Sequence, residues 1–156
     1  MAARHFYRSL EIYRANNNHM GIITALINIG SIKLQMMEFE DATTNFLEVL
    51  SYIEKNIKPE SPDSLPLRQL ATIYNNLGVI HHNQQEYDQA IDYYQRGIVI
   101  ARRIKNQSGH QGNLLNNLGR TYDELGRFEQ ALEVINEALQ LRQQQNDKQG
   151  IGSSYR

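Results

Sequence analysis

The 156-residue chain carries 16 lysines and arginines against 17 aspartates and glutamates, so its net charge is close to zero, and it contains no cysteine. The charges form no long run of one sign, which argues against nucleic acid or a membrane surface as a partner. The lack of cysteine excludes disulfides and thiolate chemistry, and we expect a cytoplasmic protein. No segment has the apolar core of a signal peptide or a membrane span.

The chain begins with half of a repeat. Residues 1–17 have the spacing of an amphipathic helix and match the second helix of a later pair, with Phe6 forty positions before Phe46 (46 − 6 = 40). Residues 18–57 predict a first full repeat, a helix pair that turns near Met37. Residues 58–66 follow as a loop, because the segment from Ile57 to Pro66 contains all three prolines of the chain.

The rest of the chain predicts two further helix pairs and the start of another helix. Residues 67–106 form a repeat that turns near Gln85, and residues 107–146 form one that turns near Gly126. The helices at their junction are expected to run longer, around a turn at Asn106 to Gly109. Residues 147–156 match the beginning of a first helix. With half repeats at both ends, we expect a single solenoid that is a piece of a longer protein.

Small residues recur at fixed positions in the three pairs. Each pair has a glycine in its first helix and an alanine twelve positions later in its second: Gly30 and Ala42, Gly78 and Ala90, Gly119 and Ala131. Two helices can pack closely only where the contact residues are small, so these positions predict the contact within each pair. One pair cannot bury its apolar faces alone, so neighbouring pairs should stack on one another.

The residues Leu77-Gly78, Tyr122, Ala131 and Ala138 resemble the tetratricopeptide repeat pattern, and the resemblance covers nearly the whole chain. It implies an all-α fold, a right-handed superhelical solenoid of antiparallel helix pairs, with about three full repeats plus half repeats at both ends. The glycines lie 48 and 41 positions apart (78 − 30 = 48; 119 − 78 = 41), against about 34 in the common repeat. The longer period resembles kinesin light chains, spindle-orientation adaptors and bacterial peptide-sensing regulators.

In the family that this chain resembles, the first helices line a concave groove, and asparagines at one register contact bound peptides. The resemblance therefore implies these groove residues: Thr24, Asn28, Thr72, Asn76, His82, Asn113, Asn117, Arg120 and Asp123. An amide offers both a donor and an acceptor, which suits the backbone of an extended peptide. The alternative is that the asparagines bond a neighbouring helix and fix the stacking. A carboxylate clamp is disfavoured because only Arg120 could serve it.

The adjacent histidines His81 and His82 are the obvious candidates for a metal site. Neighbouring residues on a helix point about 100° apart, so the pair cannot bind one ion, and His82 with Glu86 supplies too few ligands. His81 aligns with Tyr122, which favours packing between helices. No motif joins a nucleophile to a base, and no glycine-rich phosphate loop occurs. The sequence therefore predicts no metal, no cofactor and no enzyme activity.

A protein or peptide is the partner that such a groove fits. We expect an interaction module that binds a segment in its concave groove. The alternative is a ligand-sensing regulatory segment of a larger signalling or transcription protein. The end helices should leave apolar residues uncovered, among them Phe6, Leu10 and Ile12, and such faces favour self-association.

Overall fold

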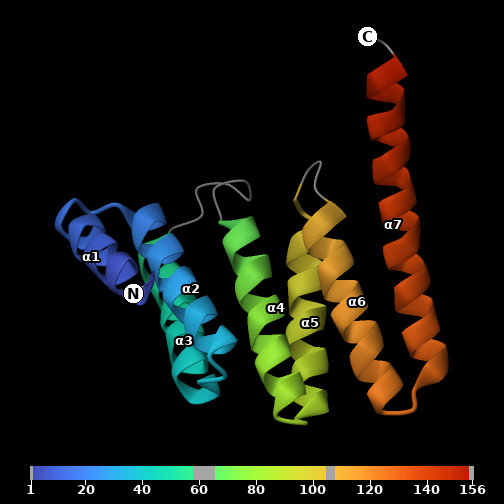
Figure 1. Cartoon of the computed structure of the whole chain (residues 1–156), viewed down its shortest axis with the longest axis horizontal. Coiled ribbons are helices and arrows are strands. Elements are labelled where there is room, and N and C mark those ends of the chain that lie inside the picture. Colours follow the sequence, from blue (N-terminus) through green and yellow to red (C-terminus); the bar gives the residue numbers. More distant parts are fainter. Residues whose placement is uncertain (1, 58–65, 105–107, 155–156) are drawn as a thin grey trace.

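The structure is a computed structural model that describes residues 2–57, 66–104 and 108–154. Helices dominate these described ranges, and no strand occurs in them. Figure 1 shows the helices in order: α1 (Ala2–Ala15), α2 (His19–Gln35), α3 (Phe39–Asn56), α4 (Leu67–Asn83), α5 (Tyr87–Ala101), α6 (Ser108–Glu124) and α7 (Phe128–Ser154). The predicted all-α fold is confirmed.

Tight turns join the helices of each pair at the predicted positions. Met37, Gln85 and Gly126 have positive φ angles of 62°, 62° and 70°, the left-handed conformation that ends many helices. The next residue then donates its backbone N–H to a carbonyl five positions earlier, as Glu38 does to Lys33 at 2.9 Å. The same bond recurs at the other two turns. Each first helix therefore ends in the same way, although only one of the three turn residues is glycine.

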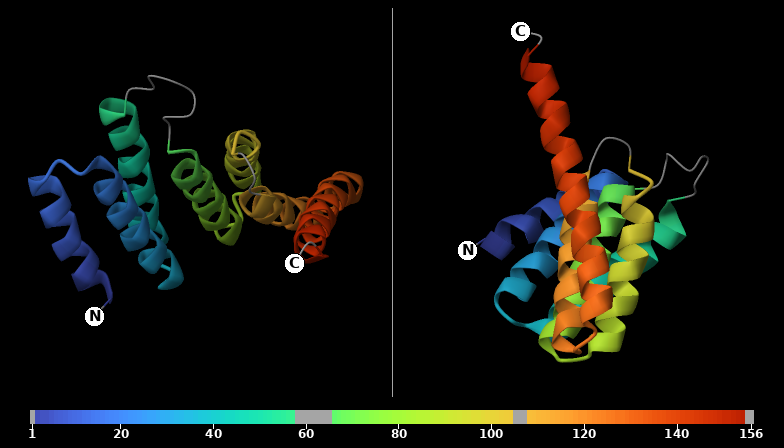
Figure 2. Two further views of the ribbon diagram at one scale, coloured as in Figure 1. Left: turned by 90° about the horizontal axis from the view of Figure 1, so that it is seen from above. Right: turned by 90° about the vertical axis from the view of Figure 1, so that its right-hand side faces the viewer.

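The helix pairs stack side by side. α2 packs on α3, α4 on α5 and α6 on α7, while α4 also contacts both α2 and α6. Seen from above, α3 and α5 lie on one side of the row formed by α2, α4 and α6 (Figure 2). α1 packs against α2 at the N-terminal end of this row. The row of first helices carries the predicted groove residues, so the stacking brings successive copies of that register next to each other.

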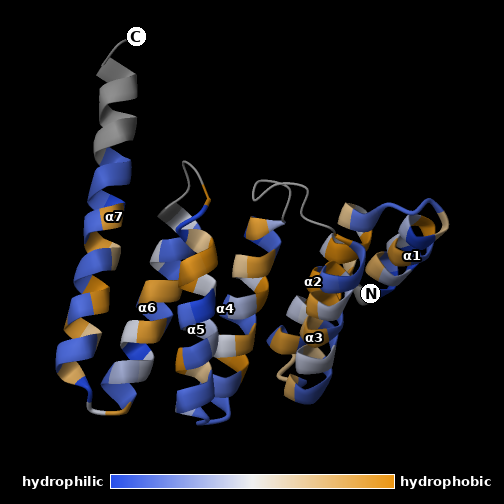
Figure 3. Ribbon diagram, turned by 180° about the vertical axis from the view of Figure 1, so that it is seen from behind, coloured by the Kyte–Doolittle hydropathy of each residue, from blue (hydrophilic) through white to orange (hydrophobic). Residues whose placement is uncertain are grey.

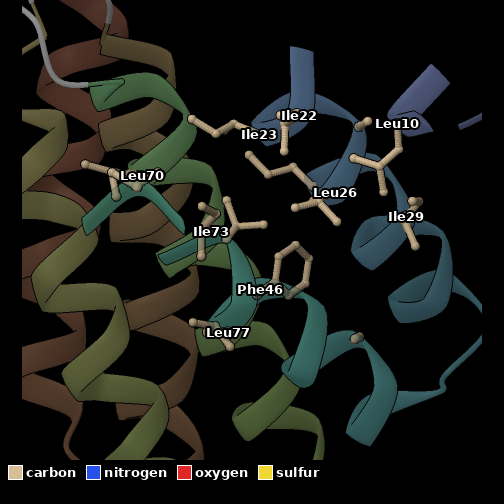
Figure 4. Close-up of a cluster of buried hydrophobic side chains, with 14 of the residues drawn as sticks. Leu10, Ile22, Ile23, Leu26, Ile29, Phe46, Leu70, Ile73 and Leu77 are labelled. Atoms are coloured by element: carbon tan, nitrogen blue, oxygen red, sulfur yellow. The ribbon is translucent and has the colours of Figure 1, made fainter. Parts of the chain in front are cut away.

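Two clusters of buried apolar side chains run through the stack. The first joins α1 to α4 and includes the fully buried Ile23, Phe46 and Leu77 (Figure 4). The second joins α4 to α7 around Tyr94 and Leu114, which are also buried. The apolar stripes at three- and four-residue spacing supply these side chains, so tertiary burial stabilises the helices.

Glycine lies where the two helices of a pair approach most closely. A Cβ atom added to Gly78 on α4 would lie 2.4 Å from Cε1 of Tyr94 on α5. At the same position of the first pair, a Cβ on Gly30 would lie 3.0 Å from Cε1 of Phe46. Ala90 is completely buried. The interpretation of these positions as a packing pattern is therefore confirmed.

Three helix ends differ from the predicted ones. α5 ends at Ala101 and α6 already begins at Ser108, so Gly109 lies in a helix and not in a turn. α7 runs without a break to Ser154, because no proline interrupts it, so no turn separates residues 146 and 147. Residues 58–65 of the predicted loop and residues 106 and 107 of the predicted turn lie outside the described residues, as does residue 105.

The N-terminal helix exposes less apolar surface than predicted. Leu10 is only 5% exposed, because α1 lays its apolar face against α2, and Phe6 is half-buried in the same cluster. The prediction that these two side chains lie uncovered is wrong. Ile12 does lie exposed, as predicted.

Candidate functional site

Three of the predicted groove residues meet in a pocket between α2 and α4. This open pocket of about 230 Å³ is lined by Thr24, Ile27, Asn28, Arg68, Gln69 and Thr72. Side chains four residues apart lie on one face of a helix, which places Thr24 beside Asn28 and Arg68 beside Thr72. Ile27 is buried, whereas the hydroxyl, amide and guanidinium groups supply donors and acceptors. An apolar surface with a few polar groups around it is typical of ligand sites.

The asparagine side chains bridge neighbouring first helices. Nδ2 of Asn117 on α6 donates to Oδ1 of Asn75 on α4 at 2.9 Å. Asn76 on α4 reaches Oγ of Ser31 on α2 at 3.4 Å, which is long for a hydrogen bond. Both amides are half-buried. This geometry supports the stacking alternative for Asn117, while peptide binding by the asparagines stays a prediction.

His82 is a further bridge between α4 and α6. Its Nδ1 atom lies 2.9 Å from Oγ1 of Thr121, and that hydroxyl donates its own hydrogen to the backbone carbonyl of Asn117. The hydroxyl can then only accept from the imidazole, so Nδ1 of His82 is the donor. Burial lowers the pKa of His82, Arg120 lowers it further, and Glu124 acts in the opposite direction. The imidazole is therefore neutral at pH 7 and holds two first helices together.

The other predicted groove residues lie further along the row, on α6. Asn113, Arg120 and Asp123 are exposed there and do not line the pocket between α2 and α4. Sequence reasoning missed Arg68 and Gln69, which do line it. Arg68 precedes the predicted Thr72 by four residues, so the helical spacing could have identified it.

The second histidine of the pair is engaged in packing. His81 stacks on the ring of Tyr93 with 5.2 Å between ring centres, and its Nδ1 contacts the carboxylate of Glu86. In the part of the chain that the structure describes, no group of three or more histidine, aspartate or glutamate side chains could hold a metal ion. Nor is any helix of that part long and apolar enough to cross a membrane.

Two curated proteins with similar sequences are much longer than this chain. It is 26% identical to Protein HGV2 of Halocynthia roretzi over 129 residues, which cover 82% of this chain and 22% of that protein. It is 34% identical to G-protein-signaling modulator 1 of Homo sapiens over 65 residues, which cover 42% of this chain and 10% of that protein. The matched segment is therefore a small part of either relative.

Solved structures and a family model agree on the architecture. The crystal structure of BtubC (BKLC) from P. vanneervenii is similar with a TM-score of 0.75 at 24% identity, covering 93% of this chain and 57% of that one. The APC/C hetero-tetramer Cut9-Hcn1 gives a TM-score of 0.50 at 19% identity, covering 90% and 29%. At these identities the likeness shows the fold alone. Residues 69–144 match the family model of the tetratricopeptide repeat. Residues 69–144 are therefore a tetratricopeptide-repeat segment, and the chain has the all-α solenoid fold of the similar solved structures.

Proposed function

We propose that this chain binds an extended peptide or protein segment in the groove along α2, α4 and α6. Tetratricopeptide repeats generally serve as protein-interaction scaffolds and not as enzymes, and the match over residues 69–144 supports that general role here. The observation that carries the finer proposal is the pocket where Thr24, Asn28 and Thr72 meet. These side chains come from two stacked helices, so one segment laid across the row would contact both.

The chemistry of the pocket suits a peptide backbone. An extended peptide presents unpaired N–H and C=O groups at regular intervals. The Asn28 amide can donate to one of them and accept from another, and the Thr24 hydroxyl has the same two capacities. Arg68 adds a positive charge to the pocket lining, so an acidic side chain is the preferred neighbour. Ile27 offers an apolar surface to an alkyl side chain.

A displayed library of short linear peptides tests this function. Peptides are selected on the full chain, and the affinity of one of them is measured by isothermal titration calorimetry. Thr24→Arg fills the pocket with a long cation and is expected to weaken binding at least about tenfold. Thr44→Arg is the matched control, because Thr44 is an exposed threonine on α3 that does not line the pocket. Equal affinities of the wild type and Thr24→Arg would place the binding surface elsewhere.

Two alanine substitutions separate peptide binding from helix stacking. Asn28→Ala is expected to weaken the binding of the selected peptide, since a lost amide contact costs about 1–3 kcal/mol of binding free energy. Asn117→Ala removes the bond to Asn75 and is expected to lower the free energy of unfolding by about 0.5–1.5 kcal/mol. If Asn117→Ala instead weakens peptide binding and leaves the free energy of unfolding unchanged, the asparagines contact the bound peptide, as the family resemblance implies.

A regulatory segment of a larger protein is the second candidate. Two curated relatives contain the matched segment within much longer chains, and one of them is named as a G-protein-signaling modulator. In this alternative the same groove binds a ligand, and binding changes the activity of another domain. The cytoplasmic location, the long-repeat type and self-association also stay predictions.

A further inference from the structure

A second pocket lies between α5 and α7 and is also lined by α6. Its volume of about 350 Å³ lies within the range of about 300–1,000 Å³ that is typical of ligand sites. The buried side chains of Ile98, Leu115 and Leu118 form part of its lining. Figure 3 shows α6 between α5 and α7, with apolar residues along all three helices. None of the predicted groove residues lines this α5–α7 pocket, so it is separate from the pocket between α2 and α4.

The preceding helix pair carries an aromatic stack at the corresponding positions. The ring of Tyr93 on α5 stacks on His81 of α4, with 5.2 Å between ring centres, and on Tyr74 of α4, with 6.4 Å. Tyr93 also packs against the first cluster of buried side chains, which includes Val49 and Ile53 of α3. One of the chain's own rings therefore covers the apolar side chains at this place.

The next helix pair lacks this ring. The offset of 41 residues between the two pairs (119 − 78 = 41) gives the counterparts of the three stacked residues: Val134 for Tyr93, Leu115 for Tyr74 and Tyr122 for His81. All three counterparts line the α5–α7 pocket. Valine has no ring, so the place that Tyr93 fills in one pair stays open in the next. Tyr122 keeps an aromatic side chain there, on which another ring can pack.

The acidic side chains of the pocket favour a positive charge. Glu137 is already paired, because its Oε1 atom accepts from Nη2 of Arg102 and from Nε2 of Gln111, each at 3.0 Å. Glu133 lies four residues earlier on α7, lines the pocket and is exposed. It makes no hydrogen bond or ion pair with any residue that the structure describes. Its carboxylate can therefore accept a hydrogen bond from a cation bound beside the apolar lining.

We propose that the α5–α7 pocket binds an aromatic ring that stands next to a positive charge. The ring takes the place that Tyr93 takes in the preceding pair, against Leu115 and Tyr122, and the cation faces Glu133. A free aromatic amine has this chemistry, and so does an aromatic side chain beside a lysine or arginine of another protein. The proposal does not depend on peptide binding between α2 and α4.

Three ligands with the same phenol ring and different charges test the pocket. Tyramine is a cation, para-ethylphenol is neutral and para-hydroxyphenylpropionate is an anion. Binding to the full chain is followed by proton–nitrogen correlation NMR with assigned backbone amides. Saturable shifts are expected around Leu115 and Val134, with an affinity that falls about two- to fivefold at each step from the cation to the anion. No saturable shifts at these positions, or tightest binding of the anion, would overturn the proposal.

A ring supplied by the chain itself locates the binding site. Val134→Tyr introduces the residue that the preceding pair has, and it is expected to weaken tyramine binding at least about tenfold. Leu132→Tyr is the matched control, because it adds the same ring to an exposed position of α7 that does not line the pocket. Equal affinities of these two variants would overturn the proposal. If circular dichroism shows that Val134→Tyr does not fold, Val99→Trp takes its place, because Val99 lines the pocket and is exposed.

The role of Glu133 has its own test. The wild-type chain is expected to prefer tyramine to para-ethylphenol about two- to fivefold, the effect of one exposed ion pair, and Glu133→Gln is expected to remove this preference. Glu129→Gln is the matched control, because it removes the same charge from an exposed position one turn earlier on α7 that does not line the pocket. A preference that survives in Glu133→Gln would overturn the assignment of the cation.

A short peptide distinguishes the two sources of the ring. The probe is acetyl-Ala-Tyr-Lys-Ala amide, and its control has leucine in place of tyrosine. Tighter binding of the tyrosine peptide than of tyramine supports a protein side chain as the ligand, and tighter binding of tyramine supports a free amine. If both peptides bind equally and more tightly than tyramine, the ring is not what the pocket recognises, and the proposal is wrong.

Discussion

Replacing Gly78 by alanine tests the contact between α4 and α5. The added Cβ would lie 2.4, 2.6 and 2.8 Å from three carbon atoms of the Tyr94 ring, which is completely buried. At these distances the ring or the two helices have to shift, and overpacking of this kind costs about 1–3 kcal/mol. Alanine returns about 1 kcal/mol as the better helix former. We expect a net loss of up to about 2 kcal/mol and a fall in Tm of up to about 8 °C.

Two other glycines provide the controls for thermal and urea unfolding followed by circular dichroism. Gly112 lies within α6, and an added Cβ would meet nothing within 4 Å, so Gly112→Ala is expected to stabilise by about 0.5–1 kcal/mol. Gly30→Ala is expected to be nearly neutral, because its Cβ would approach Phe46 only to 3.0 Å. If Gly78→Ala proves as stable as Gly112→Ala, the close contact with Tyr94 does not exist in solution.

Three further substitutions probe the turns, the core and the histidine bridge. Met37→Gly is expected to raise the free energy of unfolding in urea by roughly 0.5–1 kcal/mol, because a side chain at a φ of 62° is strained. Gly126→Ala should lower this free energy, and shifts of both variants in the same direction would contradict the reasoning. Ala90→Leu overpacks a fully buried position and should cost about 1–3 kcal/mol; an unchanged Tm would refute the register. Because burial lowers the pKa of folded His82, the unfolded chain takes up the proton first as the pH falls through about 6.5, so stability should fall there. His82→Gln should flatten that part of the pH profile, and equal slopes would count against the bridge.

The helix pairs could be predicted from sequence because their signals are local and repeated. One helix pair can be identified from Gly78 in its first helix, the turn at Gln85 and Ala90 in its second helix. The same spacing identifies the other two pairs. The ends of α5 and α7 could not be predicted in this way. Where no proline ends a helix, the helix propensity of a few more residues changes the free energy of folding only slightly. The packing of their side chains changes it more, so packing decides where the helix ends. The beginning of α6 at Ser108 is such a case.

The pocket was predictable only in part. Alignment of the repeats places Thr24, Asn28 and Thr72 on the first helices of their pairs. The stacking of these helices brings the three side chains together. Arg68 joins them from the first turn of α4, directly after the predicted loop. The sequence has no second copy of that loop, so it could not predict how α4 approaches α2.

Adjacent asparagines can connect one first helix to both of its neighbours. Neighbouring residues point about 100° apart, so a helix packed between two others presents one amide to each side. On α4, Asn76 reaches back to Ser31, and Asn75 accepts from Asn117 of the following helix. A pair that serves stacking in this way leaves less of its hydrogen-bonding capacity for a ligand. Asn117 already donates one N–H to Asn75 at 2.9 Å, so only its second N–H and its carbonyl oxygen are left for a peptide. Asn28 lines the open pocket instead, which is why the proposed peptide contacts concentrate at the α2–α4 end of the row.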